Sequence, residues 1–149
     1  AAGYGDSHVD DAFEVFNAVR NDVTLFPEAR AALVSLRERF VLVAVTNGNA
    51  DLERIGIRDL FDDVVSATMA GAAKPARRIF DHAVNAGGAS ARQTLHVGDH
   101  PLHDVHGARD AGLRAVWVNR NGEQWPDEYP APDGEVRHLG ELDDLLSSR

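Results

Sequence analysis

The chain has 149 residues, of which 44% are hydrophobic and 26% charged, and its formal net charge is -9. This length suits one domain with a hydrophobic core. The acidic balance argues against a nucleic-acid partner, which needs a basic protein face. The sequence has no cysteine, which excludes disulfides, thiol chemistry and cysteine zinc sites. Its longest apolar run, Phe40 to Val45, is far shorter than a membrane span, and its first residues lack signal-peptide character. We therefore expect a cytoplasmic protein without a membrane partner.

Stretches of helical and strand character alternate along the sequence. Helices are predicted where apolar residues recur every three or four positions, and strands where β-branched residues run together. In chain order we expect a helix over 10–20, a helix from Pro27, a strand over 41–45, a short helix over 50–54, a weak strand over 64–67, a helix over 75–86, a strand over 94–97, a helix over 104–111, a strand over 115–118, an edge strand over 136–139 and a helix over 141–146.

This alternation predicts an α/β fold, a doubly wound, mostly parallel sheet with helices on both faces. The run Val41 to Val45 is apolar at every position, which is typical of a strand buried on both faces. In such sheets ligands bind beyond the carboxyl ends of the strands. Thr46 and Asp99 each follow a predicted strand directly, so a site is predicted at this edge.

Three kinds of polar group surround that edge. The Thr46 hydroxyl could donate to a phosphoryl oxygen, or it could merely end its strand. Lys74 is the only lysine of the chain, and a compact ammonium suits a phosphoryl oxygen and a carboxylate. Asp99 and Asp104 share one tight loop, where two carboxylates repel each other unless a cation sits beside them. Mg²⁺ prefers such a pair together with water and phosphate oxygens, although either aspartate could instead cap a helix.

The aromatic and imidazole side chains nearby leave alternatives open. His96, His100, His103 and His106 crowd the same region, but a zinc site needs three or four converging ligands. Trp117 is interpreted as a core residue. Trp125 lies in a long predicted loop over 119–133 and is either a lid residue or a loop anchor.

Three ordered stretches, Val41–Asn49, Ala70–Pro75 and Leu95–Asp104, resemble the second, third and fourth motifs of the haloacid dehalogenase-like (HAD) hydrolases. Most members of that family are Mg²⁺-dependent phosphatases. The resemblance runs from about residue 25 to the C-terminus and is strongest to the capped phosphatase branch. It implies that residues 1–24 are the tail of a helical cap and that residues 25–149 form an HAD-like α/β core.

The resemblance also assigns roles to individual residues. It implies that Thr46 and Lys74 are catalytic, and that both bind the phosphoryl group together with Asn47. The resemblance implies that Asp99 and Asp104 hold Mg²⁺. It also implies a second possible role for Asp104, which is to support Lys74. One departure, Ala76-Arg77 in place of Asp-Pro after the Lys-Pro pair, falls at a helix start and is expected to be tolerated.

The family's first motif, Asp-x-Asp after a buried strand, has no counterpart in this sequence. Neither Asp6-Ser7-His8 nor Asp10-Asp11 follows an apolar strand. The resemblance places the missing strand mid-sheet, between the strands that end at Thr46 and Asp99. Its absence would leave backbone groups unpaired, at about 1–3 kcal/mol for each buried group. We therefore expect a missing N-terminal segment, or a strand from another chain, to complete the sheet.

The expected function is that of a Mg²⁺-dependent phosphomonoester hydrolase that acts on a small phosphorylated metabolite through an aspartyl-phosphate. Without the nucleophile segment, the chain alone is expected to be inactive. Two alternatives stay open: a non-catalytic HAD-like module that binds phosphate or protein, and a 2-haloacid dehalogenase, which needs no Mg²⁺. A receiver domain is disfavoured, because its phosphorylated aspartate should precede the threonine and the lysine, and here Asp99 follows both.

Overall fold

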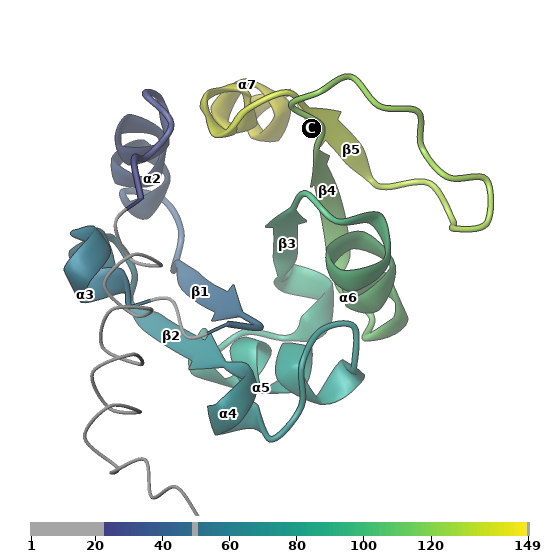
Figure 1. Ribbon diagram of the computed structural model, residues 1–149, viewed down its shortest axis with the longest axis horizontal. Coiled ribbons are helices and arrows are strands. Elements are labelled where there is room, and N and C mark those ends of the chain that lie inside the picture. Colours follow the sequence, from purple (N-terminus) through teal and green to yellow (C-terminus); the bar gives the residue numbers. More distant parts are fainter. Residues whose placement is uncertain (1–22, 49–50, 149) are drawn as a thin grey trace, which may run out of the picture.

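The computed structural model describes residues 23–48 and 51–148 (Figure 1). The expected helix over 10–20, and nearly all of the expected cap tail, lie outside these residues. Helices and strands alternate, as predicted. In chain order they are α2 (Ala29–Arg37), β1 (Val43–Thr46), α3 (Leu52–Ile55), η1 (Arg58–Leu60), β2 (Asp63–Ser66), α4 (Ala67–Ala70), α5 (Arg77–Ala86), η2 (Ala91–Gln93), β3 (Leu95–Gly98), η3 (Pro101–His106), α6 (Gly107–Asp110), β4 (Arg114–Val118), β5 (Gly134–Val136), η4 (Leu139–Glu141) and α7 (Leu142–Ser147).

The described strands form two separate sheets, both entirely parallel. Strand β1 pairs only with β2, in the register Val43 to Asp63. In the second sheet β4 lies between β3 and β5, with Val97 opposite Val116. No ladder joins β1 to β3, so within the described chain each of these strands keeps one open edge. The interruption falls where the family resemblance places a missing central strand.

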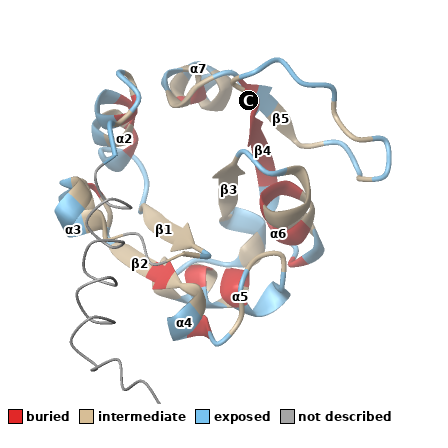
Figure 2. Ribbon diagram, viewed as in Figure 1, coloured by how far each residue is buried: buried red, intermediate tan, exposed pale blue. Residues whose placement is uncertain are grey.

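Two clusters of buried side chains cover the two faces of the β3–β4–β5 sheet. Alternate residues of β4 point to opposite faces, since side chains of a strand alternate with period two. Ala115 and Trp117 join the cluster built by α5 and α6, which also contains the fully buried Phe80. Val116 and Val118 join a second cluster, with Leu36 of α2 and Leu142 of α7. Helices on both faces confirm the doubly wound α/β fold (Figure 2).

Helix α5 shows how the sequence fixes an element next to the site. Ile79, Phe80 and Ala83 share one buried face of α5, and the helix ends at Ala86 with Gly87 as its C-cap. Gly88 follows with a φ of 64°, a left-handed conformation that costs glycine little. At its other end the helix begins at Arg77, just after the Lys74-Pro75 pair, whose peptide bond is cis. This start places the pair near the carboxyl ends of the strands.

Three elements differ from the sequence predictions. All four residues of β1 are only half-buried, not buried on both faces, because one edge of the strand faces open space. The last strand lies over Gly134–Val136, earlier than expected, because the backbone N–H of Asp133 donates to the Ala115 carbonyl at 2.8 Å and fixes this register. The helix expected from Asp104 begins at Pro101 as a π-helical turn, η3, which His100 caps by accepting from the His103 N–H.

The two tryptophans of the chain are in contact with each other. Trp117 is 2% exposed and belongs to the core, as predicted. Trp125 anchors its loop: its ring meets that of Trp117 edge-on at 5.0 Å, and its Nε1 donates to the Tyr129 carbonyl. No helix among residues 23–48 and 51–148 is long and apolar enough to cross a membrane.

Candidate active site

A buried ion pair lies where the carboxyl ends of β1 and β3 approach each other. The ammonium of Lys74 donates to Asp104 Oδ1 at 2.6 Å and to the backbone carbonyl of Val45 at 3.3 Å. The side chains of Lys74 and Asp104 are 14% and 6% exposed. Lys74 comes from the loop before α5 and Asp104 from η3, so the pair joins segments 30 residues apart in the sequence.

Asp104 is the centre of this network. Its Oδ1 also contacts His96 Nε2 at 3.1 Å, and its Oδ2 accepts from the His100 backbone N–H at 3.0 Å. Burial raises the pKa of Asp104, but the His96 hydrogen bond and the charge and hydrogen bond of Lys74 outweigh it and hold the pKa well below the ordinary 3.8. Asp104 is therefore a carboxylate at neutral pH, and both of its oxygens have partners.

Gly98 makes room for this carboxylate. A Cβ on Gly98 would lie 2.4 Å from Asp104 Cγ and 2.6 Å from its Oδ2, distances at which atoms overlap. Glycine at the end of β3 therefore lets Asp104 fold back against the strand and reach Lys74. Gly107 has the same role toward the lysine loop, since a Cβ there would lie 2.8 Å from the Pro75 Cα.

Hydrogen bonds hold Thr46, the last residue of β1, and Asn47, which follows it. Asn47 clamps the lysine loop, because its Oδ1 accepts from the Lys74 N–H at 2.6 Å and its Nδ2 donates to the Lys74 carbonyl at 2.9 Å. The Thr46 hydroxyl accepts from the Gly48 N–H at 3.0 Å and donates to the Gly48 carbonyl at 3.3 Å. The structure therefore brings Asn47 to Lys74, while the substrate-binding roles of Thr46 and Asn47 stay predictions.

Asp99 presents an exposed carboxylate beside the ion pair. It lines, together with Lys74 and Asp104, a cavity of about 430 Å³ at the open edges of β1 and β3. Its backbone carbonyl accepts from Trp117 Nε1 at 2.8 Å, which fixes the turn after β3. Within the described chain its side chain makes no hydrogen bond or ion pair, so the carboxylate is available to a ligand.

The structure gives the four clustered histidines different surroundings. The rings of His100 and His103 stack at 4.0 Å, and His106 lies against Tyr129. In residues 23–48 and 51–148, no group of three or more His, Cys, Asp or Glu side chains is arranged to hold a metal, so the zinc alternative gains no support. The contact of His96 with Asp104 was not predicted. One feature of the sequence could have indicated this contact. His96 and Gly98 are two positions apart on β3 and so face the same side of the strand, the side on which Asp104 packs against Gly98.

Comparison with known proteins gives a consistent result. The family model for haloacid dehalogenase-like hydrolases matches residues 1–112. The phosphoserine phosphatase of Thermus thermophilus is 37% identical over 147 residues, which cover 95% of this chain and 59% of the relative. The pyrimidine 5'-nucleotidase YjjG of Escherichia coli is 36% identical over 144 residues, covering 93% and 63%.

A solved structure agrees with these sequence matches. The crystal structure of a 2-haloacid dehalogenase from Pseudomonas syringae superposes with a TM-score of 0.92 at 37% identity, covering 98% of this chain and 65% of that one. The chain therefore spans about three-fifths of the length of these three relatives. The matched family model, the relatives and the parallel α/β architecture lead to one conclusion: this chain belongs to the haloacid dehalogenase-like hydrolases.

Proposed function

We propose that the chain is the larger part of a Mg²⁺-dependent phosphomonoester hydrolase that acts on a small phosphorylated metabolite in the cytoplasm. The observation that carries this proposal is the buried Lys74–Asp104 pair beside the free carboxylate of Asp99, all lining one cavity. An oriented ammonium next to a carboxylate that can bind a cation suits the stabilisation of a phosphoryl group in transfer. Two relatives, named as a phosphoserine phosphatase in T. thermophilus and as a pyrimidine 5'-nucleotidase in E. coli, support the substrate class.

Lys74 would be the group that contacts the phosphoryl oxygens. An ammonium has three protons, and two of those of Lys74 go to Asp104 and Val45. The third is left for a ligand in the cavity. Asp104 orients the ammonium and, being ionised, partly offsets its charge. Thr46 would add its hydroxyl and the adjacent backbone N–H groups.

The residues present fit a Mg²⁺ ion, since this ion binds through one or two carboxylates and completes its shell with water and phosphate oxygens. Asp99 would hold it directly. Asp104 would act through the ion's water shell, because both of its oxygens already have protein partners. When bound, the metal would neutralise negative charge on the phosphoryl oxygens.

The nucleophile in this proposal is an aspartate on the segment that completes the sheet. Its carboxylate attacks phosphorus, the bond to the ester oxygen breaks, and the leaving alcohol takes a proton. Water then hydrolyses the aspartyl-phosphate to release inorganic phosphate. The chain without that segment would bind phosphate but would not turn over a phosphomonoester.

The 2-haloacid dehalogenase function is the second candidate, favoured by the similarity to the P. syringae dehalogenase structure at 37% identity. Dehalogenation needs no cation, so the free Asp99 carboxylate favours the phosphatase. The third candidate is a non-catalytic module that binds phosphate or protein through the same cavity.

The test measures binding of orthovanadate, a phosphate mimic, to the 149-residue chain by calorimetry, with Mg²⁺ and with EDTA. We expect tighter binding with Mg²⁺, loss of this Mg²⁺ effect in Asp99→Asn, and an unchanged effect in Asp127→Asn, whose carboxylate is exposed in the long loop. Binding that is equal in EDTA would contradict the metal assignment. If the protein releases chloride from 2-chloropropionate in the presence of EDTA, the dehalogenase function is favoured. If a chain with its sheet completed binds phosphate but does not turn over a phosphomonoester, the non-catalytic binding module is favoured.

A further inference from the structure

The turn after β3 is held around Asp99 by three contacts. Gly98, which precedes Asp99, is the last residue of β3 and lies opposite Trp117 in the β3–β4 ladder. His100, which follows it, donates its backbone N–H to Asp104 Oδ2 at 3.0 Å. Between these two points, the carbonyl of Asp99 accepts from Trp117 Nε1 at 2.8 Å. The backbone of Asp99 is therefore fixed, while the residue stays exposed.

Trp117 is a rigid donor in this arrangement. It is 2% exposed and packs in the buried cluster that contains Phe80. The ring of Trp125 meets the Trp117 ring edge-on, with the two centroids 5.0 Å apart and the ring planes at 73°. Trp125 is itself held, because its Nε1 donates to the Tyr129 carbonyl at 3.0 Å. An indole enclosed in this way has no room to swing aside, so its N–H stays directed at the Asp99 carbonyl.

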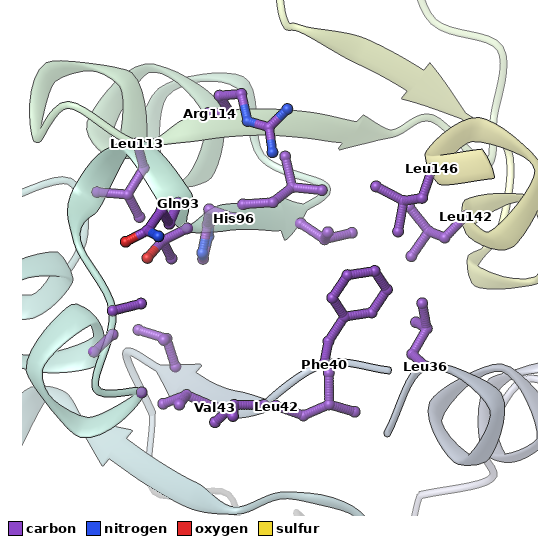
Figure 3. A pocket seen from close by; sticks show the side chains of 18 of the residues that line it. Leu36, Phe40, Leu42, Val43, Gln93, His96, Leu113, Arg114, Leu142 and Leu146 are labelled. Carbon is purple, nitrogen blue, oxygen red and sulfur yellow. The ribbon is translucent and has the colours of Figure 1, made fainter. Parts of the chain in front are cut away.

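The two faces of the β3–β4–β5 sheet differ in what they offer to this turn. Leu36, Leu142 and Leu146 gather on one face and line an apolar pocket of about 380 Å³ (Figure 3). Aliphatic side chains of this kind have no hydrogen-bond donor. Trp117 lies on the opposite face, in the cluster built by α5 and α6. The hydrogen bond from the core to Asp99 therefore comes from the face of Trp117.

The position of the Asp99 backbone matters for a bound cation. Under the proposed function, on which this inference rests, Asp99 is the direct protein ligand of Mg²⁺. This ion demands near-octahedral geometry with short ligand distances, so a displaced carboxylate binds it less well. When the backbone is already fixed, binding has to order only the side-chain torsions of Asp99. A contact that fixes this peptide group therefore contributes to cation affinity without touching the cation.

We propose that Trp117 is a positioning residue of the cation site, because its indole N–H holds the Asp99 peptide so that the carboxylate is presented to Mg²⁺. It acts through one hydrogen bond to the main chain and contacts neither metal nor substrate. A simpler role is that the buried N–H only needs an acceptor. That role predicts a loss of fold stability without a selective loss of Mg²⁺ binding, and the two roles are therefore separable by experiment.

The experiment compares Trp117→Phe with Trp125→Phe in the 149-residue chain. Each substitution keeps an aromatic ring and removes one indole N–H that donates to a backbone carbonyl, that of Asp99 in the first case and that of Tyr129 in the second. Calorimetry measures Mg²⁺ binding in the presence of orthovanadate, and urea unfolding identifies conditions in which both variants are folded. We expect Trp117→Phe to weaken Mg²⁺ binding about tenfold, as the loss of a contact that orients a metal ligand does. Trp125→Phe should leave Mg²⁺ binding unchanged.

A replacement of matched shape separates the hydrogen bond from the packing of the ring. Benzothienylalanine has nearly the shape of tryptophan but carries sulfur in place of the indole N–H. At position 117 it keeps the core filled, so it tests the proposal even where Trp117→Phe does not fold. We expect it to weaken Mg²⁺ binding at position 117 as Trp117→Phe does, and to have no effect on Mg²⁺ binding at position 125.

Tryptophan fluorescence gives a readout that does not depend on affinity. The sequence has two tryptophans, so each phenylalanine variant contains a single indole emitter. In Trp125→Phe, the emission of Trp117 should shift when Mg²⁺ and orthovanadate bind, because its N–H is bonded to the residue that takes the metal. In Trp117→Phe, the emission of Trp125 should stay unchanged under the same conditions.

Two results would overturn this proposal alone. Mg²⁺ binding of wild-type strength in Trp117→Phe or in the benzothienylalanine protein would reduce the indole N–H to a structural contact. Equal weakening in Trp117→Phe and Trp125→Phe would assign the effect to packing in general. A wild-type chain whose orthovanadate binding shows no Mg²⁺ effect would instead overturn the proposed function, and this inference with it, so the two failures are distinguishable.

Discussion

Replacing Asp104 by asparagine should strongly destabilise the fold. The substitution keeps the shape of the side chain but removes the charge that neutralises Lys74, whose side chain is 14% exposed. Removing one partner of a buried ion pair leaves an uncompensated charge, and costs about 3–5 kcal/mol. Asparagine can keep part of the hydrogen bonding to His96 and His100, so we expect about 3 kcal/mol. A domain is stable by only about 5–15 kcal/mol, so the change should be plain in urea unfolding at pH 7.

The matched control is the exposed pair of Arg77 and Asp81, at 3.4 Å with side chains 64% and 49% exposed. Asp81→Asn should change the free energy of unfolding by about 0.5 kcal/mol or less, because solvent screens exposed pairs. Equal effects of Asp104→Asn and Asp81→Asn would refute the argument that burial makes the Lys74 contact important.

The same variant has a signature in its pH dependence. The pKa of Asp104 in the folded chain lies below its ordinary 3.8, so its contribution to stability is fully present well above pH 3.8. The contribution is lost as the pH falls below about 4 and through the lowered folded pKa, because the unfolded state then binds the proton more readily. The stability difference between the wild type and Asp104→Asn should therefore be constant near neutral pH and should narrow below about pH 4. A difference that widens with acid would contradict the sign.

Three further changes test other parts of the fold in urea or thermal unfolding. Gly98→Ala forces a Cβ into the space of Asp104 and should cost about 1–3 kcal/mol or more, as overpacking does, whereas a neutral result would show that the η3 turn can move away. Phe80→Ala empties a fully buried position and should cost about 3–5 kcal/mol, with a much smaller cost contradicting its central place in the core. Trp125→Ala removes an edge-on contact with Trp117, which is worth about 0.5–1.5 kcal/mol beyond the buried area. The substitution should therefore increase protease cleavage in the loop over 119–133. Unchanged cleavage would mean that other contacts anchor this loop.

The sequence was sufficient for the order of the elements, because apolar periodicity is a local property. The parallel α/β fold and the core position of Trp117 are confirmed. The half-burial of β1 could not be predicted from its apolar run alone, since burial depends on which strands lie beside it. The final strand begins two residues and ends three residues earlier than predicted, because its register is set by the contact between Asp133 and Ala115, which are 18 residues apart.

The location of the candidate site could be predicted from the sequence, but most of its individual hydrogen bonds could not. Support of Lys74 was one of the two roles that the family resemblance implied for Asp104, and the contact at 2.6 Å agrees with it. The clamp of Asn47 on the lysine backbone depends on the path of two loops, which no local pattern specifies. The capping of η3 by His100 could not be expected either, because histidine is not among the residues that usually cap helices.

Because the sequence has a single lysine, an amine-specific reagent can modify the side chain of the candidate site selectively. Lys74 carries the only side-chain amine of the sequence, and that amine is buried and ion-paired. Acylating reagents react with an amine that they can reach, so the buried Lys74 should label slowly in the folded chain and rapidly once the chain is unfolded. The degree of acylation at this one residue, read by mass spectrometry, would therefore report how well the centre of the molecule is closed, without any probe having to be introduced.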